Sequence, residues 1–127
     1  MSVTIMVVDD SKLARIVAGK TIAALQPDWI RVEASNADEA LVLLGERQID
    51  VAVLDFNMPG RDGLELAADL RRAHADMPIA IITANIQEEV ISRARDVNAT
   101  FVSKPVTEDG MSGFLAGAAL RLKQARG

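Results

Sequence analysis

The sequence has 127 residues, of which half are apolar and a quarter are charged, a composition that is ordinary for a globular protein. We expect residues 1–127 to form a single domain, since a chain of this length can bury a sufficient core. Cysteine is absent, which excludes disulfides and thiolate metal sites. The formal net charge of −4 argues against direct nucleic-acid binding, and no apolar stretch approaches the roughly 20 residues of a membrane span. Without a secretion signal at its start, the protein is expected to be cytoplasmic, with no membrane as partner.

The first part of the chain predicts a strand and then a helix. Residues 4–8 are apolar and typical of a strand, and residues 11–25 carry apolar side chains at helical spacing. Pro27 ends this helix, because proline cannot continue one. The residues that show the helical spacing are Leu13, Ile16, Val17, Ala24 and Leu25.

The middle of the chain repeats this order of elements. Residues 30–34 predict a second strand, and residues 37–44 predict a helix that is introduced by Asn36 and ends near Gly45. Residues 51–54 predict the third strand.

Two further units follow in the same pattern. A helix is expected from about Gly63. Pro78 separates this helix from residues 79–82, which predict a fourth strand. The helix after Gly63 is marked by Leu64, Ala67, Leu70 and Arg71. The helix after the fourth strand is marked by Ile86, Val90, Ile91, Ala94 and Val97.

The last predicted unit is a strand at residues 100–103 and a helix rich in glycine. Each glycine inside a helix is less favourable than alanine by about 1 kcal/mol, and Gly110, Gly113 and Gly117 lie in or beside this one. Gly113 and Gly117 share a face, so close packing against the sheet is the simplest explanation, and docking of a partner helix is the alternative. The apolar stripe of this helix consists of Met111, Phe114, Leu115, Ala118 and Leu122.

Five strand–helix units of this length predict an α/β fold with a doubly wound parallel sheet and helices on both faces. The carboxyl ends of parallel strands meet at one edge of such a sheet, where functional residues gather. Four of the predicted strands are followed by polar residues that are therefore expected to form one site. They are Asp9, Asp10, Asp55, Thr83 and Lys104.

The acidic residues indicate a hard cation. Asp10 alone has a simpler explanation as the cap of the following helix, because aspartate is a favoured N-cap. Capping leaves Asp9 unexplained, however, and three carboxylates that include Asp55 repel one another unless a cation is bound. Mg²⁺ takes oxygen ligands and keeps several waters, so a few carboxylates and a phosphate are sufficient. We therefore favour a Mg²⁺ site.

Lys104 and Thr83 add the groups that phosphate chemistry needs. A carboxylate can accept a phosphoryl group and become an aspartyl phosphate. The oxygens of the transferred group then need a metal, an ammonium and hydroxyl or amide donors. A lysine or a threonine at a strand end is unspecific alone, but the two residues opposite an acidic cluster favour phosphoryl transfer.

Four segments of the sequence resemble the receiver domain of two-component response regulators, in particular single-domain chemotaxis regulators. They are VVDDS (7–11), LDFNMPGRDGLEL (54–66), IITAN (81–85) and FVSKPV (101–106), and they cover essentially the whole chain in the family's order and spacing. The resemblance implies a flavodoxin-like (βα)5 fold with strand order 2-1-3-4-5.

The resemblance also implies roles for the acidic and amide residues. Asp55 looks like the phosphoacceptor. Asp9 and Asp10 look like the acidic pair that holds Mg²⁺, with Asp55 and the backbone carbonyl of Asn57 as further ligands. Asn57 and Asn85 match positions that adjust how long the phosphoryl group survives.

The same resemblance assigns the remaining site residues. Lys104 would pair with a phosphoryl oxygen, and Thr83 would hydrogen-bond another. Pro105 matches the proline that follows this lysine through a cis peptide bond, a form that X-Pro bonds adopt at about 0.5–1 kcal/mol. Phe101 matches the switch aromatic that rotates inward as Thr83 moves toward the phosphate, a role that is compatible with its simpler explanation as a core residue.

On this resemblance we expect a phosphorylation-activated signalling switch. A sensor histidine kinase or a histidine phosphotransfer protein would phosphorylate Asp55 with Mg²⁺ as cofactor, and the added charge would shift an equilibrium toward an active surface. In the family that surface comprises the fourth helix, the fifth strand and the fifth helix, about residues 86–122, and it binds a downstream protein. The domain would catalyse only its own phosphorylation and dephosphorylation, as a monomer or a phosphorylation-dependent dimer, and it is not expected to be a conventional enzyme.

Two alternatives remain open at this point. The chain is either a stand-alone regulator or a receiver module excised from a larger response regulator or hybrid kinase. A haloacid-dehalogenase-type phosphatase is disfavoured, because that family has a nucleophile-x-Asp pattern after the first strand and Asp9-Asp10-Ser11 lacks that spacing. The absence of G-x-G-x-x-G and of a P-loop lysine motif also disfavours a nucleotide or flavin site.

Overall fold

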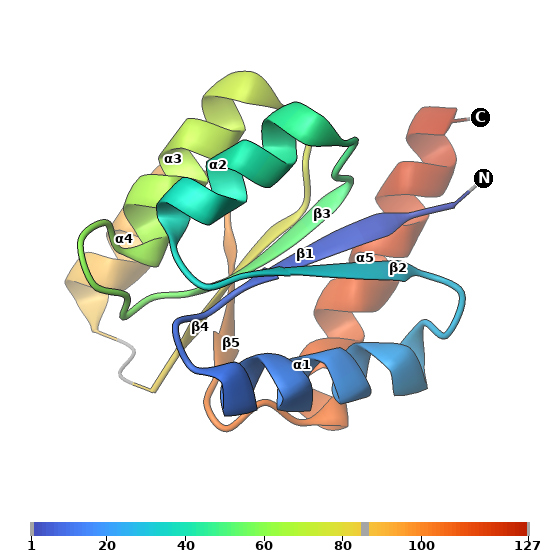
Figure 1. Ribbon diagram of the computed structural model, residues 1–127, viewed down its shortest axis with the longest axis horizontal. Coiled ribbons are helices and arrows are strands. Elements are labelled where there is room, and N and C mark those ends of the chain that lie inside the picture. Colours follow the sequence, from blue (N-terminus) through green and yellow to red (C-terminus); the bar gives the residue numbers. More distant parts are fainter. Residues whose placement is uncertain (1, 85–86, 127) are drawn as a thin grey trace.

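The computed structural model describes residues 2–84 and 87–126, and in these residues it shows a five-stranded sheet between two layers of helices (Figure 1). The strands are β1 (Thr4–Val8), β2 (Ile30–Ala34), β3 (Val51–Asp55), β4 (Ile79–Thr83) and β5 (Thr100–Ser103). The helices are α1 (Lys12–Leu25), α2 (Ala37–Glu46), α3 (Gly63–Ala73), α4 (Glu88–Asp96) and α5 (Glu108–Arg126). The strand order is β2-β1-β3-β4-β5, and every neighbouring pair is parallel, so the predicted fold is confirmed.

Different helices cover the two faces of the sheet. α1 and α5 lie against one face, and α2, α3 and α4 lie against the other (Figure 1). Successive side chains of a strand point to opposite faces. Along β1, Ile5 and Val7 therefore join the core under α1 and α5, while Met6 and Val8 join the core under the other three helices. Because both faces are covered, β1, β3 and β4 are buried along their whole length.

Helix α1 buries a different stripe from the one that marks it in the sequence. Ala18 and Ile22 are buried in the core that α1 shares with α5. Leu13, Ile16 and Val17 have exposed fractions of 71%, 41% and 41%. These three side chains form an exposed apolar surface, which we call the α1 apolar face.

The glycines of two helices can be compared with the sequence prediction. α2 ends at Glu46, in agreement with the predicted end near Gly45, and the backbone N–H of Arg47 donates to the carbonyl of Leu43 at 3.1 Å. In α5, a Cβ atom at Gly113 or Gly117 would meet no atom within 4 Å. The predicted close packing of these two glycines against the sheet is therefore wrong, because both lie on the exposed side of the helix.

Helix α4 begins at Glu88. Ile86, which contributed to the predicted helical spacing, lies outside the described residues. Val90 and Ala94 are the residues of this helix that are buried. No helix within residues 2–84 and 87–126 is long and apolar enough to cross a membrane.

Candidate functional site

The predicted site residues come from four strand ends at the carboxyl edge of the sheet. Asp9 and Asp10 directly follow β1, Asp55 and Thr83 are the last residues of β3 and β4, and Lys104 directly follows β5. The strands β1, β3, β4 and β5 are consecutive neighbours in the sheet. Their carboxyl ends are therefore adjacent, although the residues are far apart in the sequence.

The sheet itself holds the residues at the ends of β3 and β4, since both strands extend one residue further than predicted. Asp55 is in register with Ile82, and Thr83 is in register with Ser103. The backbone N–H of Lys104 donates to the carbonyl of Thr83 at 3.0 Å. These positions are thus set by strand pairing rather than by loop conformation.

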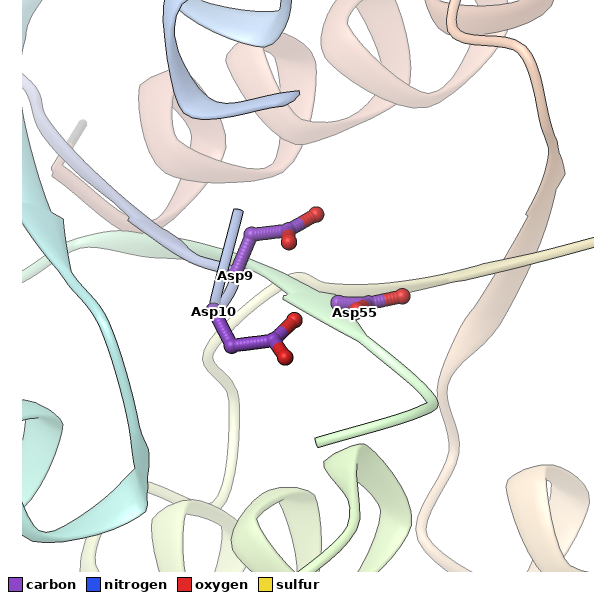
Figure 2. Close-up of side chains that lie close together, drawn as sticks. All are labelled: Asp9, Asp10 and Asp55. Carbon is purple, nitrogen blue, oxygen red and sulfur yellow. The ribbon is translucent and has the colours of Figure 1, made fainter. Parts of the chain in front are cut away.

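Three carboxylates lie together at this edge (Figure 2). One carboxylate oxygen from each of Asp9, Asp10 and Asp55 lies within 4.8 Å of the other two. Asp9 and Asp55 are buried, with exposed fractions of 6% and 2%, whereas Asp10 is exposed. The cluster therefore offers several oxygen atoms at one place that opens to solvent on the side of Asp10.

The cap of helix α1 is Ser11 and not Asp10. The Oγ atom of Ser11 accepts a hydrogen bond from the backbone N–H of Ala14 at 3.2 Å. The backbone N–H of Ser11 in turn donates to Oδ1 of Asp9 at 2.9 Å. The capping explanation of Asp10 is thus wrong, and the side chain of Asp10 remains available for another role.

Electrostatic strain is concentrated on Asp9. Burial raises the pKa of the Asp9 carboxyl above its ordinary value of 3.8, and the charges of Asp55 and Asp10 raise it further. The hydrogen bond from Ser11 and the positive charge of Lys104 lower it without cancelling the rise. A bound cation would relieve this repulsion.

Lys104 offsets the charge of Asp55. Its Nζ atom lies 2.7 Å from Oδ1 of Asp55, and the lysine side chain has an exposed fraction of 33%. The Oδ1 atom is buried and accepts no hydrogen bond from the described residues. The contact with Lys104 is therefore an ion pair, which leaves the oxygen open to a further ligand.

A cleft of about 660 Å³ lies over these groups. Asp9, Asp10, Asp55, Asn57 and Lys104 line its polar side. Its apolar side is lined by residues that include Leu13, Val17, Pro105 and Val106. The oxygen-rich donor set and the buried Oδ1 atom of Asp55 fit a hard divalent cation such as Mg²⁺.

The other predicted site residues in the described part of the chain differ in how deeply they are buried. Thr83 is 1% exposed and therefore lies below the surface of the cleft. The peptide bond between Lys104 and Pro105 is cis. Phe101 is half-buried on β5 and packs against the core under α2, α3 and α4. Asn85 lies outside the described residues.

Glycine is required where the loop after Asp55 turns back into α3. A Cβ atom at Gly63 would overlap the backbone carbonyl oxygen of Asp55 and would lie 3.1 Å from Cα of Phe56. Gly60, in the same loop, has a φ angle of 80°, which favours glycine. The path of this loop therefore depends on two glycines.

Sequence reasoning missed two arginines near the site. Arg15 donates from Nη1 to the backbone carbonyl of Asp9 at 2.7 Å. Arg93 of α4 pairs with Asp62, the N-cap of α3, at 3.2 Å. Arg15 stands one helical turn after the Ser11 cap, and helical side chains tilt toward the amino end, so its position carried a weak signal. No sequence pattern indicated the Arg93–Asp62 pair.

Comparison with known proteins identifies the family. A family model described as the response regulator receiver domain matches residues 5–115. The chain therefore belongs to the family of response regulator receiver domains. These domains take part in phosphorylation-based two-component signalling, bind Mg²⁺ at an acidic pocket and interact with histidine kinases or phosphotransfer proteins.

Similar proteins include regulators and a kinase. The positive alginate biosynthesis regulatory protein of Pseudomonas aeruginosa is 35% identical over 115 residues, which cover 87% of this chain and 45% of that protein. The cyclic di-GMP phosphodiesterase response regulator RpfG of Xanthomonas campestris is 32% identical, with 84% and 29% covered. The sensor histidine kinase RcsC of Salmonella typhi is 31% identical, with 96% and 13% covered. The chain thus spans less than half the length of each of these relatives.

Solved structures agree on the fold. The chemotaxis protein CheY4 of Vibrio cholerae has a TM-score of 0.84 at 24% identity, covering 93% of this chain and 99% of that one. A signal receiver domain of an HD domain-containing protein from Pseudomonas fluorescens has a TM-score of 0.89 at 20% identity, covering 98% and 99%. At these identities the likeness establishes the fold alone.

Proposed function

We propose that this receiver domain is switched by phosphorylation of Asp55, with the phosphoryl group supplied by a sensor histidine kinase or a histidine phosphotransfer protein. The observation that carries the proposal is the buried Asp55 carboxylate, which is paired with Lys104 at 2.7 Å and lies beside two further carboxylates. A buried nucleophile next to a cation and a metal-binding cluster is the arrangement that phosphoryl transfer requires.

In the proposed reaction an oxygen of Asp55 attacks the phosphorus atom of a phosphohistidine. The new O–P bond forms as the N–P bond breaks, and the electron pair of that bond returns to the imidazole. The ammonium group of Lys104 then pairs with a phosphoryl oxygen instead of the carboxylate. The hydroxyl of Thr83 donates to another oxygen once the group is in place.

The acidic cluster holds the cation that the reaction needs. Asp9, Asp10 and Asp55, with the backbone carbonyl of Asn57, would bind Mg²⁺ in the cleft. The metal supplies positive charge that offsets the charge on the phosphoryl oxygens. Asp9 and Asp10 bind and orient the cation and remain unmodified.

The phosphodonor protein docks on the α1 apolar face. It must reach Asp55 through the cleft, and Leu13 and Val17 form part of the cleft wall. Leu13, Ile16 and Val17 are exposed together, and a group of exposed apolar side chains is typical of an interaction site. An amphipathic helix that carries the phosphohistidine would cover this face.

The output surface comprises α4, β5 and α5, as in the family. Movement of Thr83 toward the phosphoryl group would make room for Phe101 to rotate inward, and this would change the surface that a downstream protein contacts. Asn57 and Asn85 would adjust the lifetime of the phosphorylated state. The switch would act as a monomer or as a phosphorylation-dependent dimer.

Residues 1–127 are proposed to act as one receiver domain, either alone or attached to another module. The support is that the family match spans residues 5–115 and that the relatives include longer regulators and a kinase. The full-length reading frame distinguishes the two arrangements.

The acceptor is tested by intact mass after incubation with Mg²⁺ and a small phosphodonor. We expect one phosphoryl adduct on the unchanged protein and none on Asp55→Asn or in the absence of Mg²⁺. Asp38→Asn, the same change at an exposed position on α2, is the matched control and should retain the adduct. An adduct that survives Asp55→Asn would refute the assignment, and repeated turnover of unrelated phosphoesters would favour the phosphatase alternative.

Docking is tested with a phosphorylated histidine phosphotransfer protein as donor. Leu13→Ser should slow transfer from this protein and leave phosphorylation by the small phosphodonor unchanged. Val42→Ser, which removes another exposed apolar residue on α2, is the control. Equal transfer to the two variants would contradict the docking surface.

A further inference from the structure

A guanidinium group on α1 holds the peptide that joins the two acidic residues after β1. Nη1 of Arg15 donates to the backbone carbonyl of Asp9 at 2.7 Å, and Nε donates to Oε1 of Glu33 on β2 at 2.9 Å. The Arg15 side chain is only 15% exposed. On the other side of the same residue, the backbone N–H of Asp9 donates to the carbonyl of Ala34 at 3.1 Å. Both peptide groups of Asp9 are therefore anchored.

The anchored carbonyl belongs to the peptide plane that leads into Asp10. Rotation of that plane would redirect the Asp10 side chain and would leave a partly buried carbonyl without its donor. Repulsion among the three carboxylates favours such a rotation whenever no cation is present. Arg15 opposes it through a charge-assisted hydrogen bond and is itself fixed by Glu33.

We propose that Arg15 is a positioning residue that sets the affinity of the acidic cluster for Mg²⁺. It does so by fixing the peptide between Asp9 and Asp10, so that the ligands are in place before the ion arrives. This inference rests on the proposed function of the cluster as a Mg²⁺ site. Arg15 contacts neither the ion nor the phosphoryl group.

The sign of one measurement separates positioning from simple charge. Arg15 is a cation close to a cation site, so removing its charge alone would strengthen Mg²⁺ binding. Removing an anchor of the ligands would weaken it, and loss of a group that orients metal ligands typically lowers affinity by about 10-fold or more. The two explanations therefore predict opposite changes.

The experiment is calorimetric titration of the full chain with Mg²⁺ alone, at constant ionic strength. Arg15→Met removes the charge and the donors but keeps an unbranched apolar stem, and we expect its Kd to rise about 10-fold. Arg31→Met makes the same change of net charge at an exposed position on β2 and should show no weakening. A Kd for Arg15→Met that is unchanged or lower than that of the unchanged protein overturns the inference.

A second readout uses formation of the phosphoryl adduct. In Arg15→Met the Mg²⁺ concentration for half-maximal adduct formation should rise, and the rate at saturating Mg²⁺ should equal that of the unchanged protein. A lower rate at saturation with an unchanged half-saturating concentration would contradict the positioning role. If the metal-free thermal transition shows that Arg15→Met does not fold, Arg15→Lys is the deciding variant. Lysine can make only one of the two contacts, so it must weaken Mg²⁺ binding. Absence of Mg²⁺ binding by the unchanged protein would overturn the proposed cation site as well, whereas binding that is lost in Asp10→Asn but unaffected in both Arg15 variants would overturn only the role of Arg15.

Discussion

Asp9 carries its charge at a disadvantage in the folded protein. Burial raises the pKa of its carboxyl above 3.8, the ordinary value of an aspartate in an unfolded chain. The negative charges of Asp55 and Asp10 raise this pKa further. The folded state therefore binds a proton more tightly than the unfolded state does. By linkage, the contribution of Asp9 to stability is greatest below pH 3.8 and is lost as the pH rises through the folded pKa.

Asp9→Asn should therefore stabilise the metal-free protein at neutral pH. The amide keeps an oxygen that can accept from the N–H of Ser11 but carries no charge to be repelled. Thermal unfolding with a chelator should show a higher Tm than that of the unchanged protein at neutral pH, and the difference should vanish below pH 3.8. With Mg²⁺ present the order should reverse, because the variant lacks one ligand. An equal or lower Tm of metal-free Asp9→Asn at neutral pH would contradict the assigned repulsion.

Gly63 allows the loop after Asp55 to return close to the strand. In Gly63→Ala the new methyl group would overlap the carbonyl oxygen of Asp55, and backbone atoms cannot move aside as a flexible side chain can. We expect a loss of about 1–3 kcal/mol in the free energy of unfolding, the usual effect of forcing extra volume into a packed site. Urea denaturation measures this loss. Gly19→Ala, in α1 and with no atom within 4 Å of the added carbon, is the control and should not lose stability.

Single residues of the site were predictable where a polar type ends an apolar strand. Asp9, Asp55 and Lys104 have this signal, because a strand pattern and the rule that strand ends converge place them together without knowledge of contacts. Arg15 has only the weak signal of its place one turn after the helix cap, since an arginine on a helix is usually solvated. Its role depends on a backbone carbonyl, which no residue type reveals.

Among the elements, α1 shows why periodicity left its buried face undetermined. Two stripes on this helix have helical spacing: one holds Leu13 and Val17, and the other holds Ala18 and Ile22. The structure buries the second stripe, where Thr21 is accommodated because its hydroxyl donates to the carbonyl of Val17 at 3.0 Å. Position in the layer against α5, rather than hydrophobicity, decides which stripe is covered.

Helix α3 is tied to its neighbours by one arginine at its carboxyl end. Arg71, which the sequence placed only in the helical spacing, donates to backbone carbonyls of Met77 at 2.7 Å, Val97 at 2.9 Å and Asn98 at 3.1 Å. Asn98 has a φ of 54°, in the left-handed region, and the N–H groups of Asn98 and Ala99 donate to the carbonyls of Arg95 and Ala94, so α4 ends there in a common helix-terminating turn. Arg71 thus joins the end of α3 to the start of β4 and of β5.

Arg71→Met should destabilise the fold by about 2 kcal/mol or more, because several carbonyls lose a charged donor at once. Arg71→Lys should recover little of this loss, since an ammonium cannot reproduce the fork of donors. The adjacent Arg72→Met, which breaks an ion pair with Asp69 at an exposed position, is expected to change stability by less than about 1 kcal/mol. Urea denaturation of the three variants tests the difference, and similar losses for Arg71→Met and Arg72→Met would contradict it.

For the molecule as a whole, the order of the five units was predictable because each strand is short, apolar and followed by an amphipathic segment. The parallel register then places the strand ends without further information. The exposed glycines of α5 were not predictable. Gly113 and Gly117 share a helix face, but nothing in their spacing indicates whether that face meets the sheet or solvent.

The whole domain should be stabilised by Mg²⁺ because only the folded chain brings the carboxylates together. At a concentration of 100 times Kd, one site contributes about 2.7 kcal/mol, which for a domain of this size raises Tm by several degrees. Asp10→Asn should show a smaller rise, and Asp38→Asn should match the unchanged protein. Thermal scans with Mg²⁺ and with NaCl at equal ionic strength separate binding from screening. The same Tm in both salts would contradict a specific site.

The edge position of β5 has a consequence for the growing chain. Asp9, Asp10 and Asp55 are synthesised before β4 and β5, and Lys104 comes only after both. Since synthesis proceeds from the amino end, a nascent chain carries the acids for some time without the ammonium that pairs with Asp55. The counter-charge arrives only when the last strand closes the edge of the sheet. The carboxylates of Asp9, Asp10 and Asp55 therefore lack their lysine counter-charge until β5 has been synthesised and has joined the sheet.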